Sequence, residues 1–165
     1  MKKLLVSACL LGQPVRYDGA NNQNKVLTLQ AQLQLWQQQG LLIPVCPESL
    51  GRLPTPRPAA ELRGGDGHAL LVGQARVVIA SGDDVTHAFL EGARRTLAIA
   101  QREGASAALL AARSPSCGNQ GIYNGEFNRT LQTGVGVTVA LLQNAGIRCF
   151  NPEQAEALQQ WMDEH

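Results

Sequence analysis

The sequence predicts an α/β fold, a three-layer arrangement in which helices cover both faces of an open, mostly parallel sheet. Short apolar runs, which are typical of buried strands, alternate along the chain with longer segments whose apolar residues recur at helical spacing. Elements that alternate in this way build a parallel sheet between two helical layers. The 165 residues suit one domain, and no linker divides them, so we expect a single Rossmann-like domain over residues 1–165.

Four apolar runs are the expected strands of this sheet, at residues 3–8, 41–45, 107–111 and 147–150. Helices are expected at residues 26–39, from Asp83 or Asp84 to about 103, at 134–144 and at 152–163. Residues 70–72 and 76–79 flank Gly73-Gln74 and predict a small β-hairpin insertion. Residues 51–66 are rich in Pro, Gly and Arg and are expected to form a loop.

The charge pattern argues against a nucleic-acid polymer or a membrane as a partner. The formal net charge is +1, and the sequence has neither a basic run nor an acidic tail. No stretch approaches the roughly 20 apolar residues of a membrane span, and the first residues lack the apolar core of a signal peptide. We therefore expect a cytoplasmic protein, favoured to be a monomer, that acts on a small molecule.

Three of the four cysteines are expected to meet at one edge of the sheet. Cys9, Cys46 and Cys117 each follow the end of a predicted strand, and the carboxyl ends of parallel strands share one edge, where open sheets bind ligands. The cytosol keeps thiols reduced, which argues against disulfides. Cys149 differs because it falls inside a predicted strand, where a buried thiol acts as a small apolar side chain.

Three thiolates at one edge are suited to bind a metal group. They can hold a zinc ion, or three irons of a [4Fe-4S] cluster, and either arrangement leaves one coordination position open. Simple burial of the three cysteines is an equally valid interpretation of their spacing, since cysteine is among the most buried residue types.

The loop after the first cysteine contains Arg16, Tyr17 and Asp18 between Gly12 and Gly19. Glycines at a sheet edge allow the backbone to approach a ligand closely, although a turn-rich surface loop has the same composition.

Polar residues follow the other two cysteines. Glu48 lies two residues after the second, where it can be a metal ligand, an acid–base group whose pKa the thiolates raise, or a solvated glutamate. Arg57, in the loop TPRP, is suited to bind an anionic group such as a phosphate, or is a surface arginine. Ser114 and Ser116 place hydroxyls beside the third cysteine, in a turn that Pro115 stiffens.

Several strings together resemble a known family. They are SACLLGxxxRYDG near the start, CPE followed by G-x-L-x-x-P-R, and RSPSCG, with IYNGEF and GVGVTVALL after the third cysteine. These ordered motifs, spread over roughly residues 3–147, resemble the thiouracil desulfidase family, also known as domain-of-unknown-function family 523.

The resemblance implies redox-neutral desulfuration of a thiolated uracil base or nucleotide: 2-thiouracil, 4-thiouracil or 4-thiouridine monophosphate. It implies a [4Fe-4S] cofactor held by Cys9, Cys46 and Cys117, whose fourth iron is open to the substrate sulfur. By the same resemblance, Glu48 and Ser114 form the catalytic pair.

The expected substrate contacts are Arg16, Tyr17, Asp18, Arg57 and Ser116. The two arginines would favour an anionic substrate if both point towards the thiols. This chain has Ala111-Ala112 where many relatives carry a lysine, which puts a substrate contact from that point in doubt. Two alternatives remain: an iron–sulfur or zinc-binding accessory protein without catalysis, and a zinc hydrolase, although the H-x-E motif of nucleobase deaminases is missing.

Overall fold

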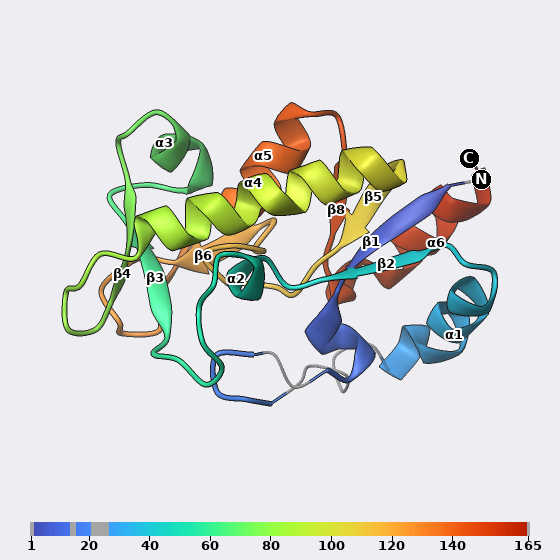
Figure 1. Cartoon of the computed structure of the whole chain (residues 1–165), viewed down its shortest axis with the longest axis horizontal. Coiled ribbons are helices and arrows are strands. Elements are labelled where there is room, and N and C mark those ends of the chain that lie inside the picture. The colour runs from blue at the N-terminus through green and yellow to red at the C-terminus, as the bar shows by residue number, and fades with distance from the viewer. Residues whose placement is uncertain (1, 14–15, 21–26, 165) are drawn as a thin grey trace.

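The computed structural model describes residues 2–13, 16–20 and 27–164. A parallel four-stranded sheet in the order β2-β1-β5-β8 forms its centre (Figure 1). The strands are β1 (Lys3–Ser7), β2 (Leu42–Val45), β5 (Ala105–Leu109) and β8 (Arg148–Phe150), each within two residues of a predicted strand. The predicted parallel sheet is therefore confirmed.

Helices cover both faces of this sheet, as predicted. α1 (Gln30–Gln38) and α6 (Ala155–Glu164) lie on one face, and α4 (Thr86–Glu103) and α5 (Val137–Asn144) lie on the other (Figure 1). The layers follow from the strand geometry, because alternate side chains of a strand point to opposite faces. Leu4 of β1 thus joins the apolar cluster under α1 and α6, whereas the neighbouring residue of β1 joins the cluster under α4 and α5.

The helix boundaries differ from the predicted ones by a few residues. The predicted start of the first helix, at residue 26, lies outside the described residues, and α1 begins at Gln30 after a short 3₁₀ turn. At the start of α4, Asp84 Oδ1 accepts a hydrogen bond of 2.8 Å from the backbone N–H of Thr86, and Gly104 ends the helix with a φ of 74°. None of the described helices combines the length and the apolar character needed to span a membrane.

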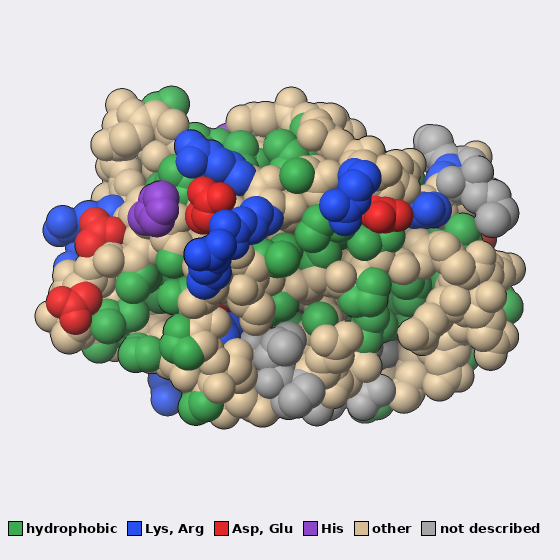
Figure 2. Space-filling model, viewed as in Figure 1, with side chains coloured by type: hydrophobic (Ala, Val, Ile, Leu, Met, Phe, Trp, Pro, Cys, Tyr) green, Lys and Arg blue, Asp and Glu red, His purple; other side chains and the backbone are tan. Residues whose placement is uncertain are grey.

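The exposed side of α4 carries charges of both signs. Glu91 and Arg95 form an ion pair of 3.4 Å, and Glu103 lies 4.0 Å from Lys3 of β1. On the face shown in Figure 2, basic and acidic side chains lie next to one another along the molecule. Paired charges of this kind contribute little to stability and keep the surface polar.

The predicted hairpin at residues 70–79 is wrong. Residues Gly67–Leu71 form a helix, α3, because the Asp66 side chain accepts a hydrogen bond of 3.1 Å from the N–H of Ala69 at the first turn. Gly73, with a φ of 80°, therefore follows a helix instead of forming the centre of a hairpin turn.

The antiparallel insertion exists, but with a different partner strand. β4 (Arg76–Ile79) pairs with β3 (Ala60–Arg63), which lies in the segment expected to be a loop. A second antiparallel pair, β6 (Gly121–Tyr123) and β7 (Leu131–Thr133), was not predicted, since each of its strands has only three residues.

The short helix α2 (Pro47–Leu50) lies against α4 at a close approach between backbones. A Cβ atom on Gly92 of α4 would be 1.9 Å from the carbonyl oxygen of Pro47, and one on Gly51 would be 2.1 Å from the carbonyl oxygen of Ala88. Only glycine fits at these two positions. This contact fixes the segment that follows β2, and with it the second of the three cysteines.

The Gly92→Ala variant is expected to lower the free energy of unfolding by about 1–3 kcal/mol, because α2 must move away from α4 to make room for the new methyl group. The gain in helix propensity from glycine to alanine, about 1 kcal/mol, opposes this loss but does not cancel a clash with backbone. Urea denaturation followed by circular dichroism measures the change. Gly121→Ala is the matched control, since its Cβ would come no closer than 3.7 Å to another residue; equal stability of the Gly92→Ala variant and the wild type would show that the contact is loose.

Candidate active site

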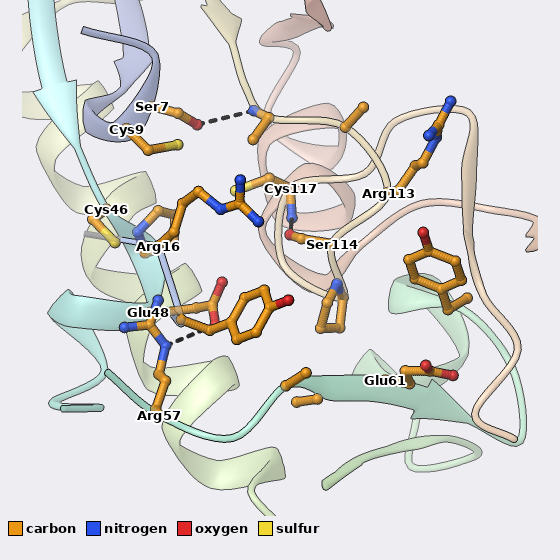
Figure 3. A pocket seen from close by; sticks show the side chains of 18 of the residues that line it. Ser7, Cys9, Arg16, Cys46, Glu48, Arg57, Glu61, Arg113, Ser114 and Cys117 are labelled. Carbon is orange, nitrogen blue, oxygen red and sulfur yellow. Dashed lines mark hydrogen bonds and ion pairs between the residues drawn. The ribbon is translucent and has the colours of Figure 1, made fainter. Parts of the chain in front are cut away.

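The three cysteines follow three neighbouring strands of the sheet. Cys9 lies in the 3₁₀ helix η1 (Ala8–Leu11) after β1, Cys46 follows β2 directly, and Cys117 lies in the turn region after β5. All three line one cavity of about 510 Å³, and Figure 3 shows their side chains around one end of it. The structure thus brings the three thiols together, as the strand pattern predicts.

The thiol of Cys117 is strongly affected by its surroundings. Burial raises its pKa well above the usual range, and the charge of Glu48 raises it further. A hydrogen bond from Ser116 lowers the pKa, whereas negative charge on Cys9 and Cys46 raises it. The two other thiols are therefore near enough to oppose ionisation of Cys117.

A cation among the sulfurs would reverse this effect, because a metal group deprotonates the thiols that bind it. Within the described ranges, the structure contains no group of three His, Cys, Asp or Glu side chains that is arranged to hold a metal ion. The donor chemistry nevertheless fits an iron–sulfur or zinc group, since three soft sulfur donors line one end of the same cavity (Figure 3).

Cys149, the fourth cysteine, lies in β8, as predicted, and is not part of this cavity. Burial raises the pKa of its thiol to about 12. It therefore stays protonated at neutral pH, in keeping with its interpretation as a small apolar side chain.

Ser114 organises the turn that carries the third cysteine. Its Oγ accepts hydrogen bonds from the backbone N–H groups of Cys117, at 2.7 Å, and of Ser116, at 3.1 Å (Figure 3). Since the oxygen accepts two hydrogen bonds, the hydroxyl hydrogen remains for a different acceptor. Ser114 lines the cavity, so this hydrogen can be donated to a ligand there.

The same turn is held from behind by the start of α5. The N–H of Val137 donates to the carbonyl of Pro115 at 2.8 Å, and the N–H of Thr138 donates to the carbonyl of Ser116 at 2.9 Å. These are donors that a helix leaves without partners at its first turn. A Cβ on Gly136 would be 2.4 Å from the carbonyl oxygen of Ser116, so glycine is needed for this approach. The segment GVGVTVALL is thus the support of the third cysteine.

The predicted substrate contact of Ser116 is not supported. Its side chain is buried, with an Oγ that lies 2.6 Å from Oγ1 of Thr138 on α5, and it is not among the residues that line the cavity. Ser116 points into the protein because the turn places Ser114 on the cavity side. Ser116 attaches the turn to α5, and its hydroxyl lowers the pKa of the third thiol.

Glu48, in the first turn of α2, lies at the same end of the cavity as the thiols (Figure 3). Its Oε1 forms an ion pair of 3.2 Å with Nε of Arg57. Burial raises the pKa of the Glu48 carboxyl, and the positive charge of Arg57 only partly offsets this. Glu48 and Ser114 both line the cavity that the three cysteines share, and their expected role as a catalytic pair stays a prediction.

Arg57 is not the exposed arginine that its Pro-rich surroundings suggest. Its side chain is only 4% exposed, and Nη1 donates hydrogen bonds to the carbonyl of Pro54 and to Oγ1 of Thr55. Arg57 borders the cavity, but Nε and Nη1 of its guanidinium contact other groups of the protein.

Arg16 and Tyr17 line the cavity, as predicted, and Asp18 does not. Asp18 Oδ2 instead lies 3.3 Å from Nη2 of Arg16, and its Oδ1 accepts a hydrogen bond from the N–H of Ala20. Asp18 thus shapes the loop and pairs with Arg16, while its predicted contact with substrate is not supported.

The end of the cavity away from the thiols contains residues that the sequence did not single out. They are two arginines and two aromatic residues from the β5–β6 and β6–β7 connections and from β6: Arg113, Arg129, Tyr123 and Phe127. Arg113, Phe127 and Arg129 have φ values of 69°, 57° and 62°, a left-handed region that non-glycine residues rarely adopt. Such backbone conformations often occur at ligand sites. The sequence signal that could have revealed this part of the cavity is the motif IYNGEF, which contains Tyr123 and Phe127.

Glu61 holds the β6–β7 turn in place. Its Oε1 accepts hydrogen bonds from the N–H of Gly125, at 3.0 Å, and of Phe127, at 3.2 Å. Arg63 on the same strand donates to the carbonyl of Gly125 at 2.7 Å. The insertion formed by β3 and β4 therefore positions the far wall of the cavity.

Ala111 and Ala112 also line the cavity. A lysine at either position would reach into this space. The alanines leave this space open; Ala111 lies near the thiol end, where its N–H donates to Oγ of Ser7 at 3.1 Å (Figure 3).

Comparisons with known proteins agree with these features. Residues 4–154 match the family model of 2-thiouracil desulfurase. The chain is 42% identical over 151 residues to the uncharacterized protein YbbK of Bacillus subtilis (strain 168), which covers 92% of this chain and 96% of YbbK.

The chain is also similar to a solved structure of TudS, described as a [4Fe-4S]-dependent thiouracil desulfidase and designated DUF523. The TM-score is 0.87 at 41% identity, and the comparison covers 100% of both chains. The resemblance drawn from the sequence motifs is thereby confirmed. The chain belongs to the 2-thiouracil desulfurase family.

Proposed function

We propose that this protein removes sulfur from a thiolated uracil compound, with a [4Fe-4S] cluster bound by Cys9, Cys46 and Cys117. The observation that carries the proposal is the single cavity that Cys9, Cys46 and Cys117 share with Glu48 and Ser114. Membership of the 2-thiouracil desulfurase family and the similarity to TudS, a [4Fe-4S]-dependent enzyme, support it.

The reaction is a hydrolysis. Water supplies the oxygen of the new carbonyl group, the carbon–sulfur bond breaks, and sulfur leaves as sulfide with the protons of the water. Carbon and sulfur keep their formal oxidation states, so no electron donor is consumed. A cluster with only three protein ligands supplies one open iron, a soft Lewis acid suited to a thiocarbonyl sulfur.

The protein's own groups move the protons and orient the substrate. In this reaction Glu48 takes a proton from the attacking water and passes it to the leaving sulfur; Arg57 holds only one of its two carboxylate oxygens, so the other can contact the water. Ser114 donates its hydroxyl hydrogen to the substrate, because both of its accepted hydrogen bonds come from the backbone of its own turn.

The substrate that fits best is a nucleotide such as 4-thiouridine monophosphate, and 2-thiouracil and 4-thiouracil are the smaller candidates. The cavity of about 510 Å³ is in the range of sites for molecules much larger than a single pyrimidine ring. Arg113 and Arg129 are among its lining residues, and a phosphate would lie beside them if the base is at the thiols. Arg113 is half-exposed and also lies 3.4 Å from Glu153, an ion pair that a phosphate would have to share or replace. Tyr17, Tyr123 and Phe127 also line the cavity and offer apolar surfaces to a substrate.

Single Cys→Ser changes at positions 9, 46 and 117 are expected to abolish iron binding or to reduce it strongly, because serine is a poor ligand for a soft metal group. Cys149→Ser is the matched control and should keep the full iron and sulfide content, since Cys149 lies outside the cavity. Iron and sulfide analysis with absorption spectra after anaerobic reconstitution measures both. Normal iron content in any of the three variants would remove that cysteine from the ligand set.

Glu48→Gln and Ser114→Ala are expected to keep the cluster and to lose turnover, by about a hundredfold or more if Glu48 transfers protons. Loss of thiocarbonyl absorbance and release of sulfide, without added reductant, give the rate. The exposed residues Glu156 and Ser49 provide the matched controls Glu156→Gln and Ser49→Ala. If reconstituted wild-type protein with a verified cluster converts none of the three candidate substrates, the protein is instead an accessory iron–sulfur protein.

Arg129→Ala and Arg113→Ala are expected to raise KM for 4-thiouridine monophosphate by about tenfold or more, because each loses a charge-assisted contact with the phosphate. The free bases should show little change, since they carry no phosphate. Arg94→Ala, on the exposed side of α4, controls for a general loss of positive charge. Equal effects on the nucleotide and the free base would show that these arginines act on the fold or on the base.

A further inference from the structure

We propose that Arg57 is a positioning residue: it holds the carboxylate of Glu48 at the thiol end of the cavity and does not bind the anionic part of the substrate. The inference rests on the proposed function, in which Glu48 transfers protons. It assigns a role to the motif G-x-L-x-x-P-R, which the cluster and the catalytic pair leave unexplained.

The contact between the two side chains is direct and largely buried. Nε of Arg57 lies 3.2 Å from Oε1 of Glu48, and the exposed fractions of the two side chains are 4% and 20%. A buried guanidinium must have its charge compensated, and removal of one partner of such a pair leaves an isolated charge. Arg57 and Glu48 therefore determine each other's positions.

The remaining contacts of Arg57 fix the direction of its side chain. Nη1 donates to the carbonyl of Pro54 at 3.0 Å and to Oγ1 of Thr55 at 2.9 Å. Its backbone N–H donates to the carbonyl of Tyr17 at 2.5 Å. Nε and Nη1 are thus engaged by Glu48 and by the loop, and these contacts would be lost if the guanidinium turned towards a phosphate. Arg57 thus links the helix that carries Glu48 to two loops around the cavity.

The ion pair occupies only one oxygen of Glu48. No described residue donates a hydrogen bond to Oε2, so this oxygen remains available to water or substrate (Figure 3). The planar guanidinium defines the orientation of the carboxylate by contacts that the single ammonium group of lysine cannot all replace. A displacement of about 1 Å in an acid–base group can cost about a hundredfold in rate.

The test compares Arg57→Gln, Glu48→Gln and the double variant, all with a verified cluster. Arg57→Gln is expected to lower kcat by about tenfold to a hundredfold, and to change KM for nucleotide and free base by less than about twofold. In the Glu48→Gln background, Arg57→Gln should cause no further loss, since it acts through Glu48. Arg52→Gln, at an exposed position of the same loop, is the matched control and should behave as wild type.

A crystal structure of the Arg57→Gln variant gives a readout that needs no turnover. The Glu48 carboxylate is expected to change its rotamer or become disordered, while the three cysteines keep their positions. If the wild type proves inactive on thiolated pyrimidines, the proposed function fails, and this structure still decides whether Arg57 positions Glu48.

Three results would overturn the proposal: a rise in KM for the nucleotide alone, losses that add in the double variant, or an unmoved Glu48 in the crystal. If Arg57→Gln does not fold, Arg57→Lys takes its place, because it keeps the buried positive charge. It should lower kcat at unchanged KM and retain more activity than Arg57→Gln where both fold; full wild-type kcat in Arg57→Lys would show that the guanidinium geometry has no role.

Discussion

Three cysteines from distant parts of the chain can share one cavity only if the backbone around them holds them there, and the rest of this structure serves that constraint. The parallel sheet brings three strand ends to one edge, but it does not fix the loops that follow. Two close backbone contacts fix these loops. Gly92 allows the segment after Cys46 to lie directly against α4, and Gly136 allows the turn of Cys117 to lie directly against the start of α5. The helices on one face of the sheet are therefore as important to the site as the strands.

The parts of the site that follow from strand order could be predicted from the sequence. Apolar runs that end directly before Cys9 and Cys46, and shortly before Cys117, are enough to place three thiols at one edge, because parallel strands leave no other arrangement. The burial of Cys149 within a strand follows from the same pattern. The family motifs then supplied the expected roles of Glu48 and Ser114, which spacing alone left open.

Contacts between segments distant in sequence could not be predicted. Arg57 resembles a surface arginine in its Pro-rich loop, and only the position of α2 reveals Glu48 as its partner. Gly73-Gln74 fits both a hairpin turn and the end of a helix, and the hydrogen bond that decides, from the N–H of Ala69 to Asp66, depends on a few residues. The far wall of the cavity depends on hydrogen bonds between Glu61 and a turn more than sixty residues later.

The wide separation of the three cysteines along the chain has a consequence for the order of events during biosynthesis. No two of Cys9, Cys46 and Cys117 are close in sequence, and the third belongs to a turn that is complete only when the backbone donors of α5 reach it. A chain emerging from the ribosome therefore has Cys9 and Cys46 long before the third cysteine of the set is made. A metal group that needs all three cysteines is therefore fully bound only when the fold is complete up to α5, and its binding energy adds to the stability of that folded state.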